Sequence, residues 1–124
     1  MNKGEVMIVY TVAPSIFAFG GTHEFLKTEI DEYERINIGK GYYGILFYND
    51  MRNIYHICEE TSGTLIGTYR DKFILIGNIK SDVETGDTAI MIEQVKQGME
   101  NKERAKMLDK SEWFNRFDGK GDVE

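Results

Sequence analysis

The arrangement most typical of ligand chemistry is a pair of glycines followed by a threonine: Gly20, Gly21 and Thr22. Glycines let backbone N–H groups approach an anion closely, and a helix beginning there would add partial positive charge. This combination predicts a phosphate site, although its spacing matches neither the Walker loop nor the dinucleotide fingerprint. The alternative is a glycine corner in which Thr22 caps a helix. Three further side chains are candidates to complete a phosphate site: Lys40, Tyr42 and Arg70.

Histidine and cysteine, which serve as general bases, nucleophiles and zinc ligands, occur at three positions: His23, His56 and Cys58. In a strand, His56 and Cys58 would share a face about 6–7 Å apart, which is too far for a nucleophile–base pair. The chain has no CxxC or HxxxH spacing of the kind that zinc sites use. We therefore expect no metal and no cofactor, and an enzyme with His23 or His56 as its base is the last of our hypotheses.

Carboxylates are dense in one short stretch of the chain, which includes Glu29, Asp31 and Glu32. We expect this stretch to end a helix, where acidic side chains oppose the helix dipole. A cluster of carboxylates at a position where it destabilises the helix predicts contact with a basic partner. The complementary charge of that partner would speed association. The alternative is a solvated helix face.

Three large aromatic residues lie close to the end of the chain: Trp113, Phe114 and Phe117. Apolar surface of this size must be buried, and aromatic side chains are enriched at interface cores. They either dock on their own sheet or form an interface with a partner or a second copy. The second alternative predicts a twofold-symmetric homodimer.

The composition limits the classes of function. The chain has 124 residues, a net charge of −6 and one cysteine. That length predicts a single domain over residues 1–117 with a flexible tail over 118–124. The negative charge argues against general nucleic-acid binding, and the lack of a second cysteine fits a cytoplasmic protein. The longest apolar stretch, residues 6–19, is shorter than a membrane span, so no membrane association is expected.

The elements that must position these residues form an α+β fold. We expect a mainly antiparallel sheet of five or six strands, which starts with a strand at 5–12 and contains a meander over 42–80. The meander ends in a predicted hairpin of strands 64–69 and 72–79. One helix is expected near 23–35, where apolar residues recur at spacings of four and three. One or two further helices follow at the C-terminus.

These features predict a small acidic, non-catalytic binding or regulatory protein. It would act by stoichiometric binding to a partner protein, as inhibitors, immunity proteins and phage accessory proteins do. The alternative from a different class is a small-ligand binder that holds or sequesters a phosphate-bearing metabolite or nucleotide signal at Gly20, Gly21 and Thr22.

Overall fold

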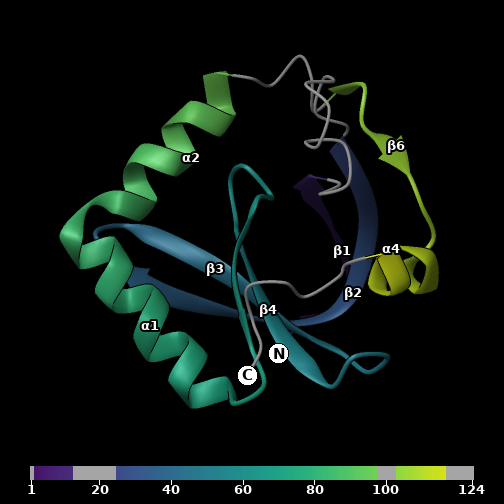
Figure 1. The fold of residues 1–124 in the computed structure, drawn as a ribbon, viewed down its shortest axis with the longest axis horizontal. Helices are drawn as coiled ribbons and strands as arrows, with labels where there is room; N and C mark the ends of the chain where they lie inside the picture. The colour runs from purple at the N-terminus through teal and green to yellow at the C-terminus, as the bar shows by residue number, and fades with distance from the viewer. Residues whose placement is uncertain (1, 13–24, 98–102, 117–124) are drawn as a thin grey trace.

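The structure is a computed structural model that describes residues 2–12, 25–97 and 103–116. Figure 1 shows α1 and α2 on one side of a sheet, with β6 and α4 on the opposite side. The described elements follow in this order: β1 (Asn2–Val12), β2 (Phe25–Gly39), β3 (Tyr42–Asn49), β4 (Ile54–Glu59), β5 (Leu65–Tyr69), α1 (Lys72–Thr85), α2 (Asp87–Gln97), β6 (Lys106–Met107) and α4 (Lys110–Arg116). The expected α+β class is confirmed. None of the described helices is long and apolar enough to cross a membrane.

The sheet is an antiparallel meander in the order β1-β2-β3-β4-β5, and β6 adds a short parallel pairing to β2. The sheet curls until its first strand meets the turn between β4 and β5. Tyr10 N donates to Gly63 O at 2.8 Å, and Tyr10 also forms a parallel bridge with Thr64. This contact gives the sheet an inner and an outer face.

The prediction of a helix over 23–35 is wrong, because the described part of this range makes up most of strand β2. Leu26, Ile30 and Tyr33 are all buried on the inner face, as a helical stripe would be. The spacing of four between Leu26 and Ile30 fits the period of two in a strand, whereas the spacing of three to Tyr33 occurs where the β1–β2 register shifts, between the pairs Lys3–Glu32 and Met7–Ile30.

The strand expected over 72–79 is also wrong, because this segment belongs to helix α1. Asp71 caps the helix, and its Oδ1 accepts from Phe73 N at 2.9 Å and from Ile74 N at 3.0 Å. The apolar run suggested a buried strand, but Phe73 is 77% exposed. The residues that are buried recur at helical spacing: Leu75, Ile79 and Val83. The signals for this helix were therefore the cap and the i, i+4, i+8 pattern.

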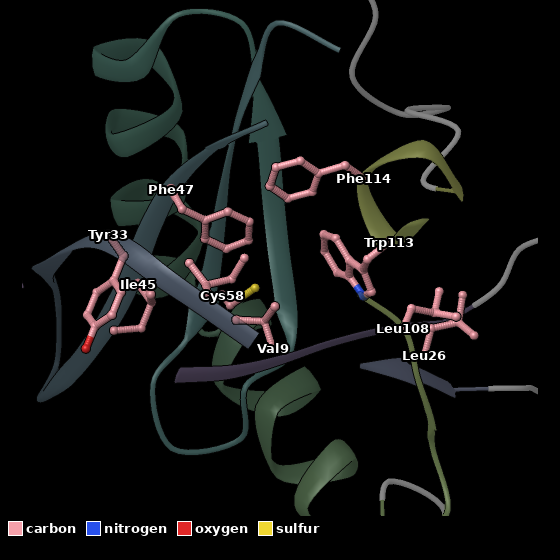
Figure 2. Close-up of a cluster of buried hydrophobic side chains, with 10 residues drawn as sticks. Val9, Leu26, Tyr33, Ile45, Phe47, Cys58, Leu108, Trp113 and Phe114 are labelled. Carbon is pink, nitrogen blue, oxygen red and sulfur yellow. The ribbon is translucent and has the colours of Figure 1, made fainter. Parts of the chain in front are cut away.

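Two hydrophobic clusters lie on opposite faces of the sheet. The outer cluster is covered by α1 and consists of Ile38, Leu46, Ile57, Leu75, Ile79 and Val83. The inner cluster is filled by strand residues together with Trp113 and Phe114 from α4, and Figure 2 shows both aromatic side chains pointing toward Phe47 and Cys58. Because α4 closes the inner face, Trp113 and Phe114 complete the core.

Gly63 lies where the curled sheet closes, and the neighbouring backbone leaves no room there for a side chain. Its φ is +71°, and an added Cβ would lie 2.7 Å from the backbone oxygen of Ile8. We expect Gly63→Ala to lower the free energy of unfolding by about 2 kcal/mol, since left-handed strain adds to a clash with backbone. Urea unfolding measures this loss. Gly41→Ala is the matched control, because Gly41 has φ +83° but open space around it. Equal losses in the two variants would contradict a role in closure.

Candidate functional site

The acidic run lies on β2, where its side chains point away from the inner cluster. Ile30 and Tyr33 both point inward, so the residues beside them point outward. Glu29, Asp31 and Glu32 are exposed, and Glu34 is 39% exposed in its side chain. We call this set the acidic stripe: Glu29, Asp31, Glu32 and Glu34.

A groove runs beside one end of the acidic stripe, between β1 and β2 and the segment that joins β6 to α4. Its volume is about 490 Å³. Two of its apolar side chains are exposed, Val6 at 51% and Met107 at 48%. The groove therefore combines apolar surface with carboxylates. Its lining residues are Val6, Thr28, Glu29, Asp31, Met107, Leu108, Asp109 and Lys110.

Asp109 holds one wall of this groove in place. It precedes α4, and its Oδ1 accepts from Glu112 N at 2.9 Å and from Ser111 Oγ at 3.0 Å. These hydrogen bonds lower the pKa of the Asp109 carboxyl, and the bond from Glu112 N has the largest effect. The carboxyl therefore stays charged. Across the groove, Lys110 Nζ lies 3.7 Å from Asp31 Oδ1.

A smaller hollow, of about 200 Å³, lies at the other end of the acidic stripe. Glu32 and Glu34 form one side of it. The opposite side is formed by Tyr48 and Tyr55, whose ring centroids are 4.8 Å apart and whose planes are tilted by 55°. Lys72 Nζ lies 3.2 Å from Glu34 Oε1 at the rim.

Two of the predicted partner contacts are not at the surface. Trp113 is 0% exposed and Phe114 is 3% exposed, so both dock on their own sheet rather than forming an exposed patch. Phe117 lies outside the described residues, as does the tail predicted over 118–124. We therefore do not propose Trp113 or Phe114 as partner contacts.

The predicted phosphate-binding residues do not come together as far as the structure describes them. Tyr42 begins β3 near the β4–β5 turn, because Gly44 pairs with Glu59. Arg70 follows Tyr69, which pairs with the other end of β4. About 20 Å of strand therefore separates Tyr42 from Arg70.

Lys40, the third candidate that the structure describes, is engaged elsewhere. Lys40, in the β2–β3 turn, donates from Nζ to Glu84 O at 3.0 Å. That carbonyl lies near the end of α1, where the helix dipole disfavours an anion. The three residues of the predicted phosphate loop lie outside the described residues: Gly20, Gly21 and Thr22.

His56 is part of the core and is held neutral. Asn49 Oδ1 accepts from Met51 N and Arg52 N at 3.0 and 3.2 Å, so its Nδ2 must face His56 Nε2, at 3.2 Å. Nε2 therefore accepts a hydrogen bond, which puts the ring proton on Nδ1. Burial lowers the pKa of His56 to about 3, and its ring stacks on Phe47 at 5.1 Å. A residue in this state does not serve as a general base near neutral pH.

Of the two other residues considered for metal or acid–base chemistry, the structure describes one. Cys58 is completely buried in the inner cluster. His23 lies outside the described residues. Over residues 2–12, 25–97 and 103–116, no group of three or more His, Cys, Asp or Glu side chains is arranged to hold a metal ion.

Sequence reasoning identified the acidic run but missed the surfaces beside it. Val6 and Met107 are far apart in the sequence, so no local signal joins them. The proximity of Tyr48 and Tyr55 could have been predicted, because they face each other across the predicted β3–β4 turn. Comparisons with protein families, with curated proteins and with solved structures find no match to this chain.

Proposed function

We propose that this chain is a non-catalytic binding protein that attaches stoichiometrically to a basic surface of a partner protein. The observation that carries the proposal is the acidic stripe on the outer face of β2, with exposed apolar side chains beside it. An apolar contact area edged by charge is the usual anatomy of a protein interface. Inhibitors and regulators of cytoplasmic enzymes act in this way, and the single buried cysteine is compatible with a reducing compartment.

The carboxylates of the acidic stripe remain available to cations of a partner. Asp31 pairs with Lys110, and Glu34 pairs with Lys72, but all four side chains are substantially exposed to solvent. Exposed ion pairs contribute less than about 1 kcal/mol each, so a partner's lysine or arginine replaces them at little cost. Complementary charge would then accelerate association by long-range attraction.

The experiment that tests this proposal begins with the partner itself. Native mass spectrometry of the protein purified from its own cells identifies a co-purifying protein and its stoichiometry. The triple variant Glu29→Lys, Asp31→Lys and Glu32→Lys is then compared with the wild type in stopped-flow association. We expect the association rate constant to fall at least about tenfold at low salt, and the difference to shrink as salt is added.

A control variant with the same change in net charge separates local from global electrostatics. Asp82→Lys, Glu84→Lys and Glu93→Lys reverse three exposed carboxylates on α1 and α2, away from the stripe. This control should retain most of the wild-type association rate. If the two triple variants associate equally fast, the acidic stripe is not the binding surface and the proposal fails.

A further inference from the structure

We infer that the surface of α1 facing away from the sheet is the interface of a homodimer, in which the α1 helices of two copies pack antiparallel and cross at Gly77. The inference goes beyond the proposed function, because none of its residues belongs to the acidic stripe. It assigns this chain a second interaction surface, whose partner is another copy of the same chain.

The helix α1 is apolar on more than the side that packs against the sheet. Leu75, Ile79 and Val83 are buried against the sheet. Phe73 and Ile74 point away from it and are 77% and 49% exposed. Figure 1 shows α1 at the edge of the molecule, with the sheet on one side of it. Apolar side chains gathered on the outer surface of a helix are typical of a protein–protein contact.

Gly77 lies in the middle of this outer surface, one turn after Phe73 and Ile74. It is exposed, and a Cβ added to it would have nothing within 4 Å beyond the local backbone. Glycine destabilises the interior of a helix relative to alanine, and no contact within the described part of the chain requires it at this position. A second helix crossing at Gly77 would require it, because two helix axes approach most closely where side chains are smallest.

The charges at the two ends of α1 favour a second copy that runs in the opposite direction. The first turn contains Lys72 and no acidic side chain, whereas the last turn contains Asp82 and Glu84 and no basic one. Arg70 lies just before the capping residue Asp71, so positive charge predominates at this end. The side chains thus add to the helix dipole at both ends instead of compensating for it. An antiparallel copy would place its negative end beside this positive end.

A twofold axis at Gly77 determines which residues meet, since residues equally far from the axis face each other. Phe73 lies four residues before Gly77 and Ser81 four residues after it. Each Phe73 ring would therefore lie over Ser81 of the second copy. Ser81 is exposed and small, so it leaves room for the ring. A large side chain opposite a small one is the packing that brings helices close together.

The same axis pairs opposite charges. Arg70 and Glu84 lie seven residues before and after Gly77, and both are exposed. Lys40 donates to the backbone oxygen of Glu84 and not to its carboxylate. Each Arg70 would therefore meet Glu84 of the second copy, and the symmetry forms this ion pair twice. Charge complementarity of the surface with itself is what identifies a second copy as the occupant.

The size of the surface sets the expected strength of the dimer. The 14 residues of α1 span about 21 Å, so two such helices bury less area than a standard interface. We expect a reversible dimer with a dissociation constant of about 10–100 µM. Sedimentation velocity of the full chain, from concentrations well below this range to well above it, measures the constant.

Charge reversal tests the pairing of Arg70 with Glu84. Arg70→Glu and Glu84→Arg should each raise the dissociation constant at least about tenfold, because each creates two like-charged pairs across the axis. The two changes shift the net charge in opposite directions, so a general charge effect cannot account for losses in both. The double variant exchanges the charges and should restore an affinity close to that of the wild type.

Two further variants test the packing at the crossing point. Phe73→Ser should weaken the dimer at least about tenfold, because it removes exposed apolar area. Gly77→Gln should also weaken it, but should raise the melting temperature of the dilute monomer, because glutamine favours a helix over glycine. Met107→Ser is the control, since Met107 is 48% exposed and lies in β6 on the opposite side of the sheet. Circular dichroism of each variant establishes that it is folded.

Three results would overturn the inference: a wild type that stays monomeric throughout the concentration range, a dimer that the α1 variants leave unchanged, and a double reversal whose losses add instead of cancelling. None of these measurements uses the basic partner. Association with that partner is measured well below the dissociation constant of the dimer, where the chain is monomeric. The dimer can therefore fail while the acidic stripe holds as the binding surface, and the reverse is equally observable.

Discussion

Replacing Trp113 with alanine is expected to lower the free energy of unfolding by about 3–5 kcal/mol, the cost of emptying a large aromatic site in a core. Trp113 is completely buried and contacts Phe47, His56 and Phe114 at ring-centroid distances of 5.6–6.2 Å. A loss of this size is a large fraction of the stability of a small domain. Chemical unfolding followed by circular dichroism measures it.

The conservative variant Trp113→Phe separates packing from polarity. Trp113 Nε1 has no hydrogen-bond partner within the part of the chain that the structure describes. Phenylalanine therefore removes no hydrogen bond seen there and leaves only a smaller void, so we expect a loss well below that of alanine, about 1–2 kcal/mol. A wild type that is an oligomer, together with a Trp113→Ala variant that is a stable monomer, would instead favour the aromatic interface that this structure does not show.

The second large effect is a loss of stability in mild acid that depends on His56. The ordinary pKa of the side chain is 6.5, and burial lowers it to about 3 in the folded protein. The unfolded chain therefore binds a proton that the folded chain excludes. The stabilisation is complete above pH 6.5 and is lost as the pH falls from there toward 3. We expect the loss to reach about 2 kcal/mol at pH 5 and about 3 kcal/mol at pH 4.

The variant His56→Gln isolates this contribution from that of the carboxylates. Glutamine cannot titrate, yet its side-chain oxygen is able to accept the hydrogen bond from Asn49 that His56 accepts. Urea unfolding at pH 7.5, 6, 5 and 4 should give a smaller acid loss for the variant, by about the amounts above. Parallel curves for the two proteins would show that the charge on His56 does not govern acid stability.

Protonation of His56 would also loosen one wall of the groove beside the acidic stripe. Asn49 Nδ2, which donates to His56, lies 3.5 Å from Phe114 O in α4. The residues just before α4, Leu108 to Lys110, form one wall of the groove. A charged His56 would turn Nε2 into a donor facing Asn49 Nδ2, so the attachment of α4 would weaken together with the fold.

Several elements could be predicted from local sequence, because their signals do not depend on the rest of the chain. The strand expected at 5–12 lies within β1, and the predicted turns correctly separate β3, β4 and β5. Turn residues and β-branched or aromatic runs act over a few residues, so local chemistry decides these elements. The acidic run could likewise be recognised from residue types alone.

The two segments in which helix and strand were mispredicted could not be assigned from local sequence. Leu26, Ile30 and Tyr33 have helical spacing, but an irregular strand register satisfies the same burial. The run Phe73–Ile76 resembles a buried strand, but the Asp71 cap and the outer face of the sheet make it a helix with Phe73 exposed. Where two structures explain one pattern, packing partners distant in the sequence decide between them.

The sequence by itself determined the α+β class, the meander of β3 to β5, the net charge and the concentration of carboxylates in one segment. Only the tertiary structure decided that this segment is a strand, that its carboxylates share one face, and that Trp113 and Phe114 belong to the core. It alone brought Val6 to Met107, and Glu32 and Glu34 to Tyr48 and Tyr55. Composition and turn chemistry are local, whereas surfaces form where register and curvature bring distant residues together.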